Sequence, residues 1–259
     1  MFPLSARHFR YIWYGAFFLL TACSTVADPA FVTPAAFRVE VSPTLEYLSP
    51  AITACSMQYP ELQLILEEKP SGDMGKTGAA VSLFWGESTI PSGVRVYRLG
   101  ADRLVYAVHK SNPLQKLTFD QALLVDRGSF TSWADVYKSF CPDCTAAETF
   151  LASPVEVWRY SPGSDVYAGI AGLSPDAINA PFGRIWLAPS ARTLSEIITN
   201  NPAAIGWLPY RWLNENLKEI SLEEIDPGRQ VIPVIAVTPG DPEPVVSHWL
   251  KCLQSSFGN

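Results

Sequence analysis

The sequence has few charged residues and few histidines. Only 17% of its 259 residues are Asp, Glu, Lys or Arg, three are His, and the formal net charge is −6. Nucleic-acid-binding proteins attract phosphates with clustered basic side chains, and no run of Lys and Arg here exceeds two residues. We therefore expect no nucleic-acid partner. No apolar run of about 20 residues occurs beyond the N-terminus, which excludes a polytopic membrane protein.

Sequence patterns of common catalytic sites are also missing. There is no Ser, His and Asp order typical of a hydrolase, no metal-ligand spacing and no complete phosphate-binding P-loop. We therefore predict that the protein is not an enzyme and that it has no cofactor and no metal site. The remaining enzymatic possibility is a thiol oxidoreductase that uses a Cys-x-x-Cys pair.

That pair is Cys141-Pro-Asp-Cys144. A redox dithiol and half of a zinc site are the functional alternatives, but no second such pair exists and a thioredoxin-like motif should open a helix. This one follows residues 133–140, which have a helical pattern, so we favour a local structural disulfide. Cys55 and Cys252 lie on apolar faces of predicted helices, where they either pair with each other or act as small buried apolar groups.

The N-terminus has the features of an export signal. Arg7 and Arg10 precede an apolar stretch at 11–22 that is too short to span a membrane comfortably. Leu20-Thr21-Ala22-Cys23 ends this stretch and resembles a bacterial lipobox, in which the cysteine is acylated and becomes the first residue of the mature chain. An ordinary signal with a nearby cleavage site and an N-terminal anchor helix are the alternatives.

The lipobox resemblance gives the first boundaries of the chain. It implies a lipoprotein signal peptide over 1–22, a lipid carrying chains such as palmitate on Cys23, and a tether over 23–32. The mature protein would then be extracytoplasmic and anchored to a bacterial membrane through this lipid.

Beyond the tether, short strands alternate with short helices. Val, Ile and Leu runs predict strands, and Ser-Pro pairs, a Thr118-x-x-Gln121 capping box and Ser190 predict helix starts. Strands separated by helices indicate an α/β fold with a mainly parallel sheet. The predicted strands are 37–41, 62–66, 79–85, 94–99, 103–109, 155–158, 204–208 and 231–237.

Several of these segments, in order, resemble the phosphate-binding (PstS-like) branch of periplasmic solute-binding proteins. Arg103-Leu-Val-Tyr-Ala-Val-His-Lys-Ser-Asn-Pro113 is similar to a family strand that ends in an Asn-Pro turn. Leu117-Thr-Phe-Asp-Gln-Ala-Leu-Leu followed by Gly128-Ser-Phe-Thr-Ser-Trp133 resembles the family's helix and turn. Asn201-Pro-Ala-Ala-Ile-Gly-Trp207 and Pro233-Val-Ile-Ala-Val-Thr are similar to later family segments. The resemblance covers most of residues 36–255.

The resemblance implies a type 2 periplasmic-binding-protein fold with two lobes, each a mainly parallel sheet flanked by helices. Lobe one would comprise residues 33–109 plus 208–259, and lobe two residues 110–207. It also implies a monomer that binds phosphate or another small oxyanion and delivers it to the permease of an ABC importer. The alternative is a lipoprotein that uses this fold as a sensor or a protein-interaction module without a transported solute.

Anion capture in such a fold relies on backbone N–H groups at helix starts and on nearby hydroxyls. The family's Arg-x-x-Gly-Ser-Gly-Thr motif corresponds to Arg159-Tyr-Ser-Pro-Gly-Ser-Asp165, in which Arg159 would pair with an oxyanion. An ordinary helix cap and turn would explain the same residues. The predicted ligand-binding residues are Ser42, Thr44, Glu87, Arg159, Ser161, Gly163, Ser164 and Asp165.

Two departures from the family pattern bear on this site. Asp165 replaces the family's threonine, and a carboxylate repels an anion unless it accepts a ligand proton or points away. Residues 71–78 are also too few for the helix that the family has there, so one anion-holding helix start is missing or shortened. Glu87 would supply the family's acidic acceptor, beside a bulky Trp85.

Overall fold

The computed structural model describes residues 35–259 except 77, 88–89, 91, 180–182 and 258–259. The predicted signal peptide, Cys23 and the tether lie outside the described residues. Residues from Ala35 onward form one compact unit. Within the described residues, no helix is long and apolar enough to cross a membrane.

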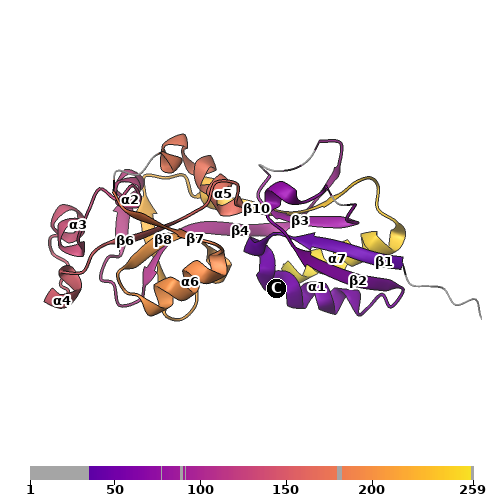
Figure 1. Ribbon diagram of the computed structural model, residues 1–259, viewed down its shortest axis with the longest axis horizontal. Coiled ribbons are helices and arrows are strands. Elements are labelled where there is room, and N and C mark those ends of the chain that lie inside the picture. Colours follow the sequence, from indigo (N-terminus) through magenta and orange to yellow (C-terminus); the bar gives the residue numbers. More distant parts are fainter. Residues whose placement is uncertain (1–34, 77, 88–89, 91, 180–182, 258–259) are drawn as a thin grey trace, which may run out of the picture. The chain divides into compact units, whose positions relative to one another are not determined.

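The first half of the sheet contains three parallel strands near the start of the chain (Figure 1). Strand β1 (Ala35–Val41) lies between β2 (Leu62–Glu68) and β3 (Val81–Trp85), and it pairs with both in parallel. Strand β10 (Val231–Thr238) then pairs antiparallel with β3 and with β4 (Arg95–His109). All five side chains of β3 are buried, as its continuous apolar sequence predicts for a strand covered on both faces.

The second half of the sheet contains later strands. Strand β8 (Ala204–Pro209) pairs antiparallel with β4 and parallel with β6 (Glu156–Tyr160), which pairs in parallel with β7 (Ile185–Ala188). Strand β9 (Leu217–Glu223) pairs with the end of β4 and with β5 (Lys116–Thr118). The sequence patterns do not predict β5, β7 and β9.

Strand β4 belongs to both halves. Its residues 95–103 pair with β10, and its residues 104–109 pair with β8 and β9. We use "first half" and "second half" for these two groups of strands and the helices beside them. The sequence-based division into lobes places residues 208–259 with lobe one, whereas β9 pairs within the second half.

Gly100 lies inside β4 rather than in a turn. The sequence predicts two strands separated near this glycine, but the strand is continuous and a register shift occurs opposite it in β10, between Val234 and Ile235. A Cβ atom on Gly100 would lie 2.6 Å from a ring carbon of Phe257. The glycine therefore allows the C-terminal helix to approach the strand closely.

Most helices begin at side-chain caps. Ser42, Ser132, Ser164 and Ser190 each accept a hydrogen bond from a backbone N–H in the first turn, and Thr118 and Gln121 form the predicted capping box. The helices are α1 (Ser49–Ser56), α2 (Phe119–Asp126), α3 (Trp133–Phe140), α4 (Glu148–Leu151), α5 (Asp165–Leu173), α6 (Ala191–Asn200) and α7 (Pro244–Phe257), and the 3-10 helices are η1 (Pro43–Leu48), η2 (Ser71–Asp73), η3 (Pro175–Ile178), η4 (Tyr210–Trp212) and η5 (Pro227–Gln230).

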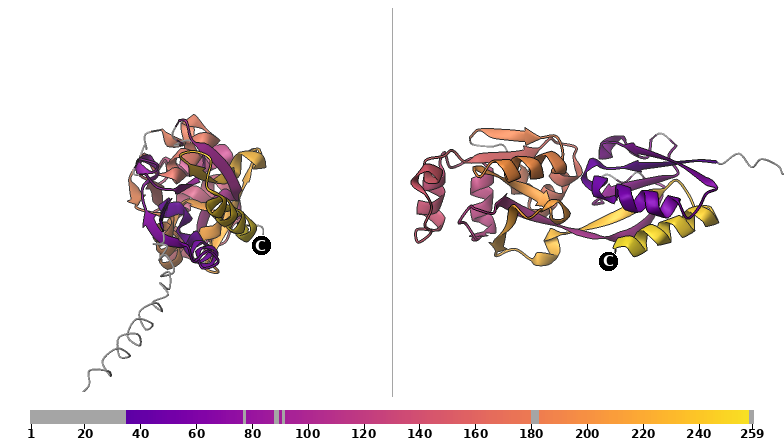
Figure 2. Two further views of the ribbon diagram at one scale, coloured as in Figure 1. Left: turned by 90° about the vertical axis from the view of Figure 1, so that its right-hand side faces the viewer. Right: turned by 90° about the horizontal axis from the view of Figure 1, so that it is seen from below.

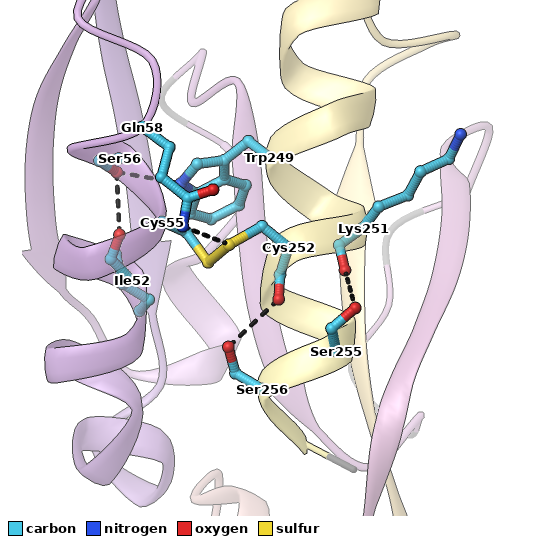
Figure 3. The surroundings of a disulfide bond; sticks show 9 residues. All are labelled: Ile52, Cys55, Ser56, Gln58, Trp249, Lys251, Cys252, Ser255 and Ser256. Carbon is cyan, nitrogen blue, oxygen red and sulfur yellow. Dashed lines mark hydrogen bonds between the residues drawn. A yellow bond between two sulfur atoms is a disulfide. The ribbon is translucent and has the colours of Figure 1, made fainter. Parts of the chain in front are cut away.

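Cys55 and Cys252 form a disulfide that joins α1 to α7 (Figure 3). The two helices lie side by side in the first half (Figure 2), although their cysteines are separated by 197 residues. Trp249 packs edge-on against Phe37 and donates its ring N–H to Ser56 Oγ at 3.0 Å. The disulfide thus joins two helices that are far apart in the sequence, beside the buried Trp249.

Cys141 and Cys144 also form a disulfide, in the short segment after α3. This agrees with the local bridge predicted from the sequence. The pair follows the end of a helix instead of opening one, unlike the thioredoxin-like arrangement. Within the described part of the chain, no three His, Cys, Asp or Glu side chains are placed to share a metal ion.

Candidate functional site

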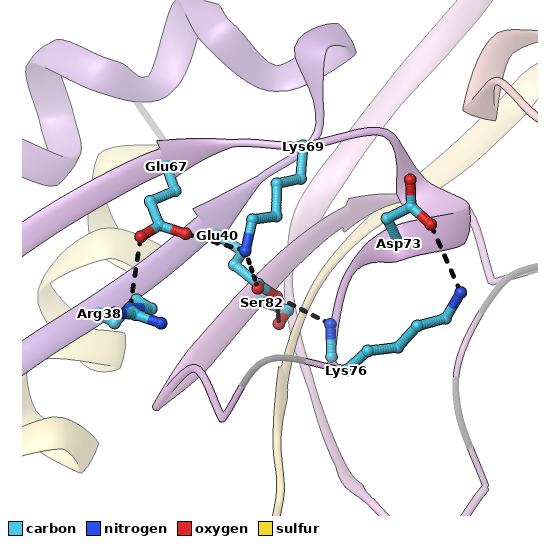
Figure 4. A network of polar contacts seen from close by, with 8 residues as sticks. Arg38, Glu40, Glu67, Lys69, Asp73, Lys76 and Ser82 are labelled. Atoms are coloured by element: carbon cyan, nitrogen blue, oxygen red, sulfur yellow. Dashed lines mark hydrogen bonds and ion pairs between the residues drawn. The ribbon is translucent and has the colours of Figure 1, made fainter.

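A buried carboxylate holds the loop before β3 in place (Figure 4). Glu40 on β1 is fully buried and accepts hydrogen bonds from Lys69 Nζ at 2.8 Å, from the Gly75 backbone N–H at 2.7 Å and from Ser82 Oγ at 2.9 Å. These contacts join β1, the end of β2, the loop and β3. They position η2, which is the short helix formed by the segment expected from the sequence to hold a missing or shortened helix start.

A cavity of about 370 Å³ lies between η2 and the starts of η1, α5 and α6. It therefore takes its walls from both halves of the sheet. Its size falls within the range of pockets that bind small molecules. The lining residues are Ser42, Pro43, Thr44, Pro70, Ser71, Gly72, Asp73, Tyr160, Ser161, Pro162, Gly163, Ser164, Asp165, Pro189, Ser190 and Ala191.

The starts of α5 and α6 both face this cavity. Ser164 caps α5 by accepting the Tyr167 N–H at 3.1 Å, and Ser190 caps α6 by accepting the Thr193 N–H at 3.1 Å. The first N–H groups of a helix have no partner within the helix, and the helix dipole makes this end positive. The cavity is therefore suited to hold a negatively charged group.

Asp165 is the first residue of α5 and is only 3% exposed. Its Oδ2 accepts a hydrogen bond from Ser42 Oγ, which joins the start of α5 to the start of η1. Burial raises the pKa of Asp165 to about 6, and hydrogen bonds from Ser42 and from the Trp85 backbone oppose this shift only in part. The cavity thus has a carboxylate in its wall.

Arg159 does not line the cavity. Its guanidinium forms an ion pair with Asp126 at 2.7 Å and donates to the backbone oxygens of Asp126 and Asn179 at 3.1 and 3.0 Å. Successive side chains of a strand point to opposite faces, so Tyr160 reaches the cavity while Arg159 turns into the protein. This placement differs from the sequence-based expectation that Arg159 contacts the ligand.

Glu87 also lies away from the cavity. It is exposed after β3, in a separate hollow with Gly169 and Arg229. The neighbouring Trp85 is buried and packs so closely against α5 that a Cβ on Gly169 would lie 2.6 Å from its ring. The two sequence-predicted acidic residues therefore separate, since Asp165 lies in the cavity wall and Glu87 lies outside it.

Of the ligand-binding residues predicted from the sequence, the structure brings six together around one cavity. Sequence reasoning missed the walls formed by 70–73 and 189–191. A signal for the second wall existed, because Ser190 is a predicted helix cap. The structure places the predicted residues Ser42, Thr44, Ser161, Gly163, Ser164 and Asp165 in the cavity wall.

No protein-family model and no curated protein matches the sequence. Solved structures do match. One is described as a phosphate ABC transporter substrate-binding protein from Clostridium perfringens with bound phosphate. It has a TM-score of 0.63 at 12% identity, and the match covers 85% of this chain and 93% of that protein. An ABC-type phosphate transport receptor from Vibrio cholerae has a TM-score of 0.58 at 16% identity over 86% of this chain and 94% of its own.

The chain has the type 2 periplasmic-binding-protein fold. The resemblance found in the sequence is thereby confirmed for the fold. A regulatory domain, that of Synechocystis CcmR in complex with 2-PG, also matches. It has a TM-score of 0.60 at 14% identity, and the match covers 86% of this chain and 98% of that domain. The neighbours named here are binding proteins and a regulatory domain.

Proposed function

We propose that the protein is an extracytoplasmic solute-binding protein whose cavity between η2, α5 and α6 holds a small solute with an anionic group, such as phosphate or another oxyanion. The observation that carries this proposal is the convergence of two capped helix starts on one cavity rich in hydroxyl groups. Backbone N–H groups and hydroxyls hold oxyanions without a permanent cation. The phosphate-binding neighbours support the same ligand class.

Blocking the cavity tests this proposal. Ser161 lines the cavity and is exposed, so Ser161→Trp should fill the cavity without disturbing the core. Ser129 is also exposed and lies outside the cavity, so Ser129→Trp is the matched control. In calorimetry with phosphate, sulfate and a panel of small carboxylates, the first variant should lose the heat of binding and the control should keep it. Binding that survives Ser161→Trp would place the ligand elsewhere.

We further propose that the chain is anchored through a lipid on Cys23 and delivers its solute to an ABC importer. The lipobox sequence supports the anchor, and neighbours described as parts of phosphate ABC transport support the importer. Intact-mass analysis of the membrane-extracted protein should show an acylated N-terminal cysteine, and Cys23→Ala should abolish it. An unmodified Cys23 in the wild-type protein would contradict the anchor.

A second candidate function is a ligand sensor. The regulatory domain with bound 2-PG supports it, because that domain matches over nearly its whole length. Uptake measurements separate the two functions. Cells that lack the chain should take up its solute more slowly if it serves an importer. Unchanged uptake by cells whose wild-type protein binds the solute would favour the sensor.

A further inference from the structure

The two halves of the sheet are joined through strand β4. In the described part of the chain the strands follow the order β2-β1-β3-β10-β4-β8-β6-β7, and β4 alone pairs with strands of both halves. Its pairing passes from β10 to β8 between Arg103 and Leu104. Elsewhere among the described residues the halves meet without a shared ladder of backbone hydrogen bonds. A change at these other contacts therefore alters how the halves meet without breaking a strand pairing.

Asp165 lies at one of these contacts. It begins α5 in the second half, but it accepts hydrogen bonds from the first half. Its Oδ2 accepts from Ser42 Oγ at the start of η1, and its carboxylate also accepts the backbone N–H of Trp85 at the end of β3. The Trp85 ring packs against α5 as well, at Gly169. A change in the charge of Asp165 therefore acts directly on the contact between the halves.

The charged and titratable side chains around Asp165 have partners of their own. Asp73 of η2 lies 3.5 Å from Lys76, and Glu46 of η1 pairs with Arg192 of α6. Burial and the two hydrogen bonds determine the pKa of Asp165, and no neighbouring charge is among its causes. The other such groups on elements packed against α5 are Tyr160 of β6, which donates to the Trp207 carbonyl at 3.1 Å, Asp102 of β4, which accepts the Trp85 ring N–H at 3.3 Å, and Arg229 of η5, which donates to the Gly172 carbonyl at 3.1 Å.

Ionisation of Asp165 favours separated halves. Burial raises its pKa from the ordinary 3.8 to about 6, whereas separation of the halves exposes the carboxyl to water and returns the pKa toward its ordinary value. A group binds its proton more tightly in the arrangement in which its pKa is higher, so protonation favours the joined halves. The ratio of joined to separated halves should fall as the pH rises from about 4 to about 6 and should then stay constant.

We propose that Asp165 makes the contact between the two halves sensitive to pH, so that the halves stay joined while its carboxyl is protonated and separate more readily once it is ionised. The cavity takes its walls from both halves, so their separation opens it to solvent. This inference goes beyond the proposed function, because it concerns the contact between the halves and needs no solute.

Pulsed electron paramagnetic resonance on the full chain in mild detergent measures the distance between the halves. Spin labels attached through keto amino acids in place of Glu61, exposed before β2, and Lys138, exposed on α3, leave the cysteines unlabelled. A second, longer distance should gain population between pH 4 and pH 8, and the ratio of the shorter to the longer should fall by up to roughly 100-fold. The ratio should level off above the pH at which the Asp165 carboxyl titrates in NMR. This comparison needs no substitution of Asp165.

Asp165→Asn then tests whether this carboxyl is the group responsible. The amide keeps a hydrogen-bond acceptor but does not ionise, so the variant should show the same distances at pH 4 and at pH 8. Asp120→Asn is the matched control, because Asp120 also lies in the first turn of a helix but is exposed and outside the cavity. The control should keep the pH dependence of the wild-type chain.

Equal distance distributions for the wild-type chain at pH 4 and pH 8 would overturn the proposal. A pH dependence that persists in Asp165→Asn would also overturn it, because another group would then be responsible. Both outcomes leave the proposed anion-binding function standing, since calorimetry with the Ser161→Trp variant tests that function separately.

Discussion

Asp126 and Asp165 are both buried carboxylates in the second half, and burial raises the pKa of each to about 6. Their partners differ. Asp126 lies beside the Arg159 guanidinium inside the protein, whereas Asp165 lies in a cavity wall with a hydroxyl as its side-chain partner. The comparison teaches that a shifted pKa alone does not separate a structural group from a binding group. The partner and the access to a cavity separate them.

Replacing Arg159 should have the largest effect on stability. Arg159→Ala leaves the Asp126 carboxylate buried without its cation, which should lower the free energy of unfolding by about 3–5 kcal/mol. Urea unfolding at pH 8 measures this, with the exposed Arg98→Ala as the control. Solute affinity should stay within about twofold for a group that does not touch the ligand. Normal stability with lost binding would show that Arg159 serves the ligand instead.

The disulfide between α1 and α7 should stabilise the protein more than the one between Cys141 and Cys144. Cys55→Ser with Cys252→Ser removes a link between residues separated by 197 positions and should cost about 2–5 kcal/mol. Cys141→Ser with Cys144→Ser removes a link across a separation of three and should cost about 1 kcal/mol. Thermal unfolding of both double variants tests which of the two losses of stability is larger. Equal losses would contradict this account of the bridges.

Asp165→Asn should raise the free energy of unfolding, whereas the substitutions above should lower it. The pKa of Asp165 is higher in the folded protein than in the unfolded chain, so the ionised form disfavours folding. The penalty is absent below about pH 4, grows as the pH rises through about 6 and is then constant. The variant should therefore be about 1–3 kcal/mol more stable than wild type at pH 8 and equally stable at pH 4.

Urea unfolding from pH 4 to pH 8 checks this pH dependence. Asp120→Asn is the matched control, because Asp120 also lies in the first turn of a helix but is exposed, so the substitution should change stability by less than about 1 kcal/mol. An Asp165→Asn variant no more stable than wild type at pH 8 would contradict the raised pKa of Asp165.

The smallest effect is expected at Ser42. Ser42→Ala removes a cap of η1 and the hydroxyl donor to Asp165, so stability should fall by about 1 kcal/mol. Because this hydrogen bond lowers the pKa of Asp165, its loss should raise that pKa above the wild-type value. Titration of the Asp165 carboxyl by NMR measures the shift, with Ser161→Ala as the control. An unchanged pKa would show that Ser42 does not interact with the carboxylate.

Local signals predicted much of this fold and part of the cavity. The caps at Ser164 and Ser190 and the Thr118 capping box depend on residues within one turn, so the sequence locates those helix starts directly. Strand β3 was predictable because a strand buried on both faces has a continuous apolar sequence. The resemblance to solute-binding proteins supplied the overall fold.

Contacts between distant residues could not be predicted in this way. Gly100 has a sequence typical of a turn, but its role depends on Phe257 in the last helix. Arg159 matches a ligand-binding motif, but its partner Asp126 comes from α2. The surroundings of Asp165 depend on Ser42, which is 123 residues away. Each of these properties requires the fold to bring the partners together.

A crystal structure of the chain grown with the solute that binds most tightly in calorimetry tests the proposed site most directly. We expect the solute between η2, α5 and α6, with its anionic group within hydrogen-bond distance of the backbone N–H groups at the helix starts. A solute bound outside this cavity would contradict the proposal.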